Sequence, residues 1–266
     1  MKVISPAKVN LMLRILGKRE DGYHLLQTYF QLLNWGDEMQ FNLSENNQIC
    51  VSGEFNNLAQ QDNLIYKAAE LLMPHNKSNS GIEIKVNKVI PQGSGLGGGS
   101  SNAGTTLRYL NKLWDCQLSH QQLQKYAITL GADVPIFLLN QSAMATGIGE
   151  KLTPYELEKQ FIVLIFPKTS IKTVDVFNDP TLIKNQMPIE LTQINQKKHW
   201  KNACLPIVIN NYQEVAEMFN SLSELNTTYM SGTGSTLFCC FDNETEANEL
   251  ISVLPKQWHV ILTQSK

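Results

Sequence analysis

The most informative stretch of the sequence is Pro91-Gln-Gly-Ser-Gly-Leu-Gly-Gly-Gly-Ser-Ser-Asn102. Five of the chain's sixteen glycines fall here within seven positions, after a segment with strand periodicity and before one with helical periodicity. Glycine lets the backbone approach a ligand and turn its N–H groups inward, and the N-terminus of a following helix adds free amides and a positive dipole end. The pattern predicts a phosphate-binding loop, in which Ser100 and Ser101 add hydroxyls for a phosphate or a metal ion.

The type of phosphate loop is narrowed by what the stretch lacks. Gly93-x-Gly95-x-x-Gly98 matches the dinucleotide fingerprint, but the match is weak in so glycine-rich a run, and no parallel strand–helix series follows it. The Walker pattern fails because Ser100 stands where a lysine is required. A flexible linker is the plain alternative, although linkers do not usually lead straight into a well-patterned helix. Any lysine that meets nucleotide charge must come from elsewhere in the chain.

Composition limits the classes of function. The 266 residues suggest one large or two modest domains, and 42% hydrophobic with 17% charged residues excludes intrinsic disorder. A net charge of −2 provides no basic surplus for nucleic acid or an anionic membrane. The longest purely apolar run, residues 161–166, is far too short to span a bilayer, and no secretory signal is recognisable. Five cysteines without a C-x-x-C pair indicate reduced core thiols, so we expect a cytoplasmic protein.

Hydrophobic periodicity predicts a mixed chain. Val9 to Ile15 alternate as a half-buried strand, which places Lys8 and Asn10 together on the face away from the core. Further strand patterns cover residues 38–43, 48–52, 82–86, 161–166, 237–241 and 260–262, and helical patterns cover 64–72, 103–114, 119–131, 215–222 and 247–254. Asp62 is predicted to cap the first helix, and residues 184–201 give no assignment. We therefore expect a mixed α/β or α+β chain with two domains, residues 1–153 and 154–266.

Three shorter segments carry polar groups in suggestive places. Asp133 precedes Pro135 at the start of a predicted helix, where the dipole stabilises a carboxylate that can act as a base, although a plain N-cap is the better reading of this segment alone. Asp21-Gly-Tyr-His24 is either a ligand-binding turn, with an aromatic ring beside an imidazole, or an ordinary hairpin turn. Residues 231–235, Ser-Gly-Thr-Gly-Ser, form a glycine turn between strands that alone is more often structural.

Together these segments resemble the GHMP kinase superfamily, which has an early lysine strand, a central glycine–serine loop and a late glycine turn. More narrowly, they are similar to its members that act on a cytidine diphosphate derivative of methylerythritol. The resemblance is carried by residues 6–11 (Pro-Ala-Lys-Val-Asn-Leu), 21–24 with 27–28, 95–101 and 131–135, and the segments 173–177 and 231–234 also fit.

The resemblance implies a two-domain α+β fold, with an N-terminal domain like ribosomal protein S5 domain 2 and a ferredoxin-like C-terminal domain. It also implies transfer of phosphate from ATP to the 2-hydroxyl of the methylerythritol group, in the non-mevalonate route to isoprenoid precursors. Mg²⁺ is expected with the nucleotide, and no residue is assigned as its ligand. The partners expected are small molecules only.

The same resemblance assigns roles to residues. Asp133 is the general base and Lys8 assists it. The ATP phosphates are held by Pro91, Gln92, Gly93, Ser94, Gly95, Leu96, Gly97, Gly98, Gly99, Ser100 and Ser101. The substrate is contacted by Asn10, Tyr23, His24, Thr173 and Phe177, of which Tyr23 and Phe177 sandwich the cytosine ring.

Two alternatives stay open at this point. Another small-molecule kinase of the superfamily, acting on homoserine, mevalonate or a sugar, is disfavoured by Asp21-Gly-Tyr-His24, because those substrates contain no cytidine. A non-catalytic nucleotide-binding member of the fold is disfavoured by the presence of both Lys8 and Asp133.

Overall fold

The computed structural model describes residues 1–55 and 58–266, which divide into two compact units. The first unit comprises residues 1–7, 35–91 and 97–141, and the second comprises 8–34, 92–96 and 142–266. Two long strands, β1 (Lys2–Lys18) and β2 (His24–Ser44), supply residues to both units. Among the described residues no helix is both long and apolar enough to cross a membrane. The predicted division after residue 153 stays a prediction.

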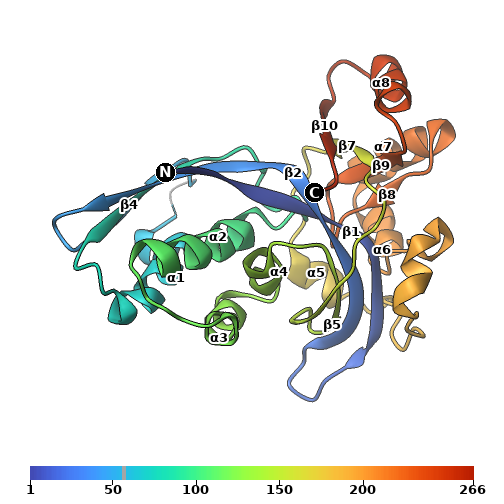
Figure 1. Cartoon of the computed structure of the whole chain (residues 1–266). Coiled ribbons are helices and arrows are strands. Elements are labelled where there is room, and N and C mark those ends of the chain that lie inside the picture. The colour runs from blue at the N-terminus through green and yellow to red at the C-terminus, as the bar shows by residue number, and fades with distance from the viewer. Residues whose placement is uncertain (56–57) are drawn as a thin grey trace. The chain divides into compact units, whose positions relative to one another are not determined.

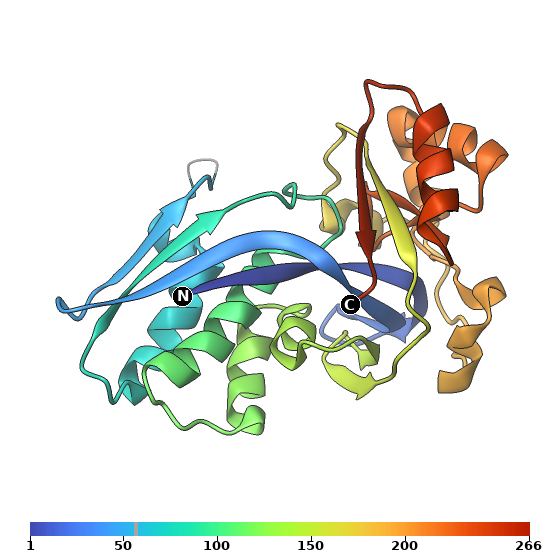
Figure 2. The ribbon, with the colours of Figure 1, turned by 45° about the horizontal axis from the view of Figure 1, so that its top comes forward.

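The first unit places helices on one face of a sheet (Figures 1 and 2). The second half of β2 pairs antiparallel with β4 (Gly81–Asn87), which pairs parallel with β3 (Ile49–Gly53). The helices are α1 (Leu64–Leu72), α2 (Gly98–Leu113), α3 (His120–Leu130) and α4 (Val134–Leu139), and the 3-10 turns are η1 (Gln60–Asp62) and η2 (Met73–His75). Alternate β4 residues and the apolar stripe of α1 share one buried cluster, as their periods predict.

Side-chain caps begin two helices of the first unit, α1 and α3. Ser119 and Gln122 form the predicted capping box of α3, which ends at Gly131 as predicted. The prediction for α1 was wrong: Asp62 ends the preceding 3-10 turn and is exposed, and Asn63 caps the helix by accepting a hydrogen bond from the Ile65 N–H at 2.9 Å. Asp and Asn are about equally favourable N-cap residues, so residue preference alone does not tell which of these two neighbours caps the helix.

The second unit contains an antiparallel sheet with helices α7 (Gln213–Leu225) and α8 (Glu244–Val253) on one side (Figures 1 and 2). The strand order is β10 (His259–Gln264), β7 (Phe161–Phe166), β9 (Leu237–Phe241) and β8 (Tyr229–Met230). The first half of β2 pairs with β5 (Ala143–Gly147), which pairs with β6 (Lys151–Pro154). The remaining elements are α5 (Thr173–Phe177), α6 (Leu205–Asn211) and the 3-10 turns η3 (Leu191–Asn195) and η4 (Lys197–His199).

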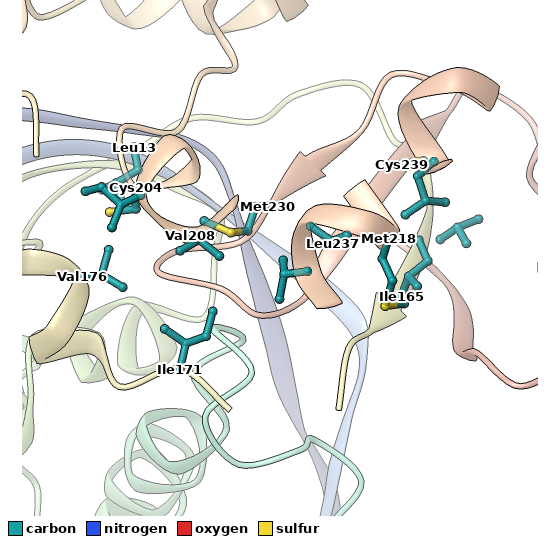
Figure 3. Close-up of a cluster of buried hydrophobic side chains, with 14 of the residues drawn as sticks. Leu13, Ile165, Ile171, Val176, Cys204, Val208, Met218, Met230, Leu237 and Cys239 are labelled. Carbon is teal, nitrogen blue, oxygen red and sulfur yellow. The ribbon is translucent and has the colours of Figure 1, made fainter. Parts of the chain in front are cut away.

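The core of the second unit joins these elements around buried sulfur and aliphatic groups (Figure 3). Burial raises the pKa of the Cys204 thiol to about 12 and that of Cys239 to about 11, so both are uncharged packing groups. All five cysteines are free thiols, and the prediction of core cysteines is confirmed for four of them. It was wrong for Cys50, which is exposed on β3.

Candidate active site

Lys8 is a buried cation in the middle of β1. The sequence predicted a half-buried strand with Lys8 and Asn10 on the open face, but they are only 3% and 4% exposed, so both faces are covered at this point. The Lys8 Nζ atom donates hydrogen bonds to Asn10 Oδ1 at 2.6 Å and to Gly95 O at 2.9 Å. It also lies 5.3 Å from the centroid of the Phe30 ring. A buried ammonium needs such partners, and they fix its position before any ligand arrives.

The late glycine turn supports the glycine loop directly. The Ser231 hydroxyl donates to Gly95 O at 2.9 Å and accepts from the Asn10 N–H at 3.2 Å, and the Thr236 N–H donates to Ser94 O at 3.2 Å. Gly95 has a φ of +76°, and a Cβ there would lie 2.4 Å from Ser231 O. The turn and residues 92–96 thus require close backbone contact that only glycine permits.

The second part of the glycine loop opens helix α2 in the first unit. Gly97 occupies the N-cap with a φ of 73° and offers no side-chain cap, so the amides of the first helical turn depend on an external partner. The predicted loop-to-helix arrangement is present, with Gly98 to Ser101 inside the first turn. One assigned hydroxyl is used elsewhere: Ser101 is fully buried and donates to Pro6 O at 2.6 Å, whereas Ser100 is half-buried. The hydroxyl of Ser101 thus has a structural partner, and its role toward phosphate stays a prediction.

A buried carboxylate that sequence reasoning missed holds both flanks of this loop. Asp37 is fully buried and accepts hydrogen bonds from the Val89 N–H at 2.8 Å, the Ile90 N–H at 2.9 Å and Asn102 Nδ2 at 3.0 Å. It also forms an ion pair with Lys88. Val89 and Ile90 precede the loop and Asn102 follows it, so one side chain joins the strand end to the helix start. These partners lie 51 to 65 residues away in sequence, and no local signal reveals them.

Asp133 stands at the N-terminus of α4, with Pro135 in the first turn as predicted. Its side chain is half-buried and makes no capping hydrogen bond to α4. The residue thus occupies the N-cap position without the side-chain bond that a plain N-cap makes.

An aromatic pair with an unused polar atom lies in the second unit. Tyr23, at the turn between β1 and β2, is 59% exposed, whereas His24 is 8% exposed and stacks on Phe177 with ring centroids 5.3 Å apart. The His24 Nε2 atom is buried without a hydrogen-bond partner among the described residues. Burial, with the charges of Lys184 and Lys18, lowers the pKa of His24, so its imidazole is neutral at pH 7. A neutral, orphaned ring nitrogen beside a stacking surface suits a nucleobase.

The structure groups the remaining assigned residues by unit. Thr173, on α5, lies in the second unit with Lys8, Asn10 and His24, and its Oγ1 is 3.2 Å from Thr233 Oγ1 of the glycine turn. Ser94, in the same unit, is 5% exposed, and its hydroxyl lacks a hydrogen-bond partner in the described part of the chain. Asp133 and residues 97–101 belong to the first unit.

Family models for both halves of a GHMP kinase match this chain. The GHMP kinases N terminal domain matches residues 63–141, and GHMP kinases C terminal matches residues 190–260. The fold and the phosphate loop thus define an ATP-dependent small-molecule kinase of the GHMP class. The mevalonate kinase of Methanococcus jannaschii shares this fold, with a TM-score of 0.71 at 14% identity over 100% of this chain and 98% of its own.

Closer relatives narrow the class. The 4-diphosphocytidyl-2-C-methyl-D-erythritol kinases of Pasteurella multocida (strain Pm70) and Pseudomonas fluorescens (strain SBW25) are each 43% identical to this chain, over 97% and 94% of it and 88% of each relative. A solved 4-(cytidine 5'-diphospho)-2C-methyl-D-erythritol kinase is 30% identical, with a TM-score of 0.85 over 99% of this chain and 98% of that one. The chain belongs to the 4-diphosphocytidyl-2-C-methyl-D-erythritol kinase family. The predicted two-domain α+β GHMP fold is confirmed.

Proposed function

We propose that this protein transfers the γ-phosphoryl group of ATP to the 2-hydroxyl of 4-diphosphocytidyl-2-C-methyl-D-erythritol, in the non-mevalonate route to isoprenoid precursors. The observation that carries the choice of substrate is the neutral His24 stacked on Phe177 with its Nε2 atom unused. Mevalonate and homoserine contain no ring to occupy such a place. The names of the 43% identical relatives support the same acceptor.

The chemistry assigned to the chain needs one base and one fixed cation. The Asp133 carboxylate takes the proton of the 2-hydroxyl. At the same time the oxygen of that hydroxyl bonds to the γ-phosphorus of ATP, and the bond from the γ-phosphorus to the departing ADP breaks. Lys8, held in place by Asn10 and Gly95, stabilises the negative charge that develops during transfer. Residues 91–101 hold the phosphates of ATP through backbone amides and the Ser100 hydroxyl.

Magnesium fits this site as part of the nucleotide complex. In the described chain, no group of three or more His, Cys, Asp or Glu side chains is placed to hold a metal ion. Phosphate oxygens are preferred ligands of Mg²⁺, which usually keeps several waters and few protein ligands. When bound, the ion neutralises part of the phosphate charge. The backbone amides at the start of α2 stabilise another part of that charge by donating hydrogen bonds.

The substrate's cytidine end is assigned to the second unit. Asn10 is oriented for it because its Nδ2 donates to Thr28 Oγ1 at 2.8 Å and its Oδ1 faces the Lys8 ammonium. His24 and Phe177 take the base, Tyr23 is free to cover it from the exposed turn, and Thr173 contributes a hydroxyl. We propose that the protein is located in the cytoplasm. The buried free thiols of this unit fit that reducing compartment.

The function is tested by comparing three phosphate acceptors. ADP release is measured with the diphosphocytidyl substrate, mevalonate and homoserine under identical conditions. We expect kcat/KM for the first to exceed the others by about 100-fold or more, because a site built for hydrogen bonding rejects ligands that leave its polar groups unpaired. Preference for mevalonate or homoserine would replace the proposed substrate. ATP binding without turnover of any acceptor would favour the non-catalytic alternative.

Removal of the stacking ring is expected to act on one substrate only. Phe177→Ala should raise KM for the diphosphocytidyl substrate roughly 10-fold, since stacking of a base on an aromatic ring is worth about 1–3 kcal/mol. KM for ATP should stay within about twofold. Val174→Ala is the matched control, because Val174 lies on the same short helix and is 58% exposed. Equal increases in both KM values would contradict the stacking role.

A further inference from the structure

The chain after α5 crosses the second unit without regular structure. Residues 178–190 form turns and irregular backbone, so their N–H and C=O groups lack the partners that a helix or sheet supplies. We call Lys184–Glu190 the strap. Side chains from the two long strands satisfy its backbone. Gln27 Nε2, on β2, donates to Ile189 O at 2.8 Å, and Gln27 Oε1 accepts from the Ile189 N–H at 2.9 Å. A side-chain amide carries both the donor and the acceptor that this pairing requires.

A second amide joins the strap to β1. The Gln186 N–H donates to Ile15 O at 2.9 Å, and Gln186 Oε1 accepts from the Ile15 N–H at 2.9 Å. Arg14 Nη1 adds a hydrogen bond to Met187 O at 3.2 Å. Two glutamines therefore replace the ladder hydrogen bonds of a strand, and they fix the strap at two points three residues apart.

The strap is connected to the predicted nucleobase site through β2 and α5. Gln27, which binds Ile189 of the strap, lies three residues after His24 on β2. The charge of Lys184, at the start of the strap, lowers the pKa of His24 after the larger effect of burial. The other charge that acts on His24 is Lys18, at the end of β1. Phe177, which stacks on His24, is the last residue of α5, directly before the irregular segment that contains the strap.

We propose that the strap is a wall of the site for the cytidine diphosphate group, and that Gln27 and Gln186 are positioning residues that hold this wall against His24. Gln27 is 6% exposed and bonded at both ends of its amide, so it acts on the ligand through the strap. The inference rests on the proposed function, because it concerns how the same cytidine site is held.

The test uses the isosteric variant Gln27→Glu. A carboxylate still accepts from the Ile189 N–H, but it cannot donate to Ile189 O and instead faces that carbonyl with a second acceptor. We expect KM for the diphosphocytidyl substrate and Kd for CDP to rise roughly 10-fold, with kcat and KM for ATP within about twofold. The rate of tryptic cleavage after Lys184, followed by mass spectrometry, should rise in the same variant.

Gln193→Glu is the matched control. Gln193 lies on η3 just beyond the strap, and its Oε1 accepts from the Glu190 N–H at 2.8 Å, a bond that a carboxylate retains. This variant should match the unaltered protein in every readout. Should Gln27→Glu bind CDP as tightly as the unaltered protein, the strap has no role in binding and the proposal is overturned.

A second variant covers the case in which Gln27→Glu does not fold. Gln186→Ala removes the acceptor for the Ile15 N–H from a half-exposed position and should also weaken CDP binding and expose Lys184 to trypsin. Unchanged CDP affinity in this variant would likewise overturn the proposal. A failure of the proposed function gives a different result. CDP would then not bind to the unaltered protein, and it would not protect the bond after Lys184 from cleavage by trypsin.

Discussion

An Asp133→Asn variant is expected to lose phosphoryl transfer while it still binds ATP. The amide keeps the size of the carboxylate but cannot take the proton of the attacking hydroxyl. General-base catalysis contributes about 100- to 10,000-fold, so kcat should fall by at least about 100-fold. The Asp133 side chain makes no capping hydrogen bond to α4, so the start of that helix does not require its charge. Single-turnover formation of ADP measures the chemical step, and calorimetric titration measures ATP binding.

Asp115→Asn is the matched control for this change. Asp115 is an exposed residue of the same unit, with a φ of 49° that asparagine tolerates well. It should retain full activity and stability. Full activity in Asp133→Asn would remove the general-base assignment, and loss of ATP binding would show that the residue serves the nucleotide instead of the acceptor.

The predictions that the structure confirms rest on interactions between neighbours in sequence. The glycine run leads directly into α2, the capping box of α3 needs only Ser119 and Gln122, and Pro135 lies in the first turn of α4. Each of these signals is complete within about one helical turn, which is the range over which backbone and side chain select one another.

Apart from the cap of α1, which differs by one residue, the features that sequence analysis missed depend on distant partners. The buried state of Lys8 follows from contacts with Phe30 and with Gly95, neither of which alters the alternating pattern of β1. The strap has no period of its own, because Gln27 of β2 satisfies its backbone at Ile189 while the Gln186 side chain binds the backbone of β1. The hydrogen bond from Ser101 to Pro6 spans 95 residues, so no local sequence signal reveals it. The family resemblance supplied residue roles, but it carried no information about these supports.

The largest expected effect on stability belongs to Asp37→Asn. The Asp37 carboxylate now accepts hydrogen bonds from the Lys88 ammonium and from Asn102 Nδ2. The amide of the variant would point N–H donors at these two donor groups. Breaking a buried ion pair on one side costs about 3–5 kcal/mol. The Lys88 side chain is 20% exposed and can recover part of its hydration, so we expect the free energy of unfolding to fall by about 2–4 kcal/mol. Urea denaturation measures this loss.

Two comparisons separate the ion pair from the anchor of the loop. Glu38→Gln, at the adjacent residue, breaks only the exposed pair with Lys2 and should cost less than about 1 kcal/mol. Combining Asp37→Asn with Lys88→Met removes the unpaired cation and should recover part of the stability. At temperatures where each variant is folded, KM for ATP should be higher in both Asp37→Asn and this double variant than in the unaltered protein. Asn102 Nδ2 would lose its bond to residue 37, which joins the helix start to residues 89–90. An unchanged KM for ATP would mean that Asp37 stabilises the first unit without positioning the phosphate loop.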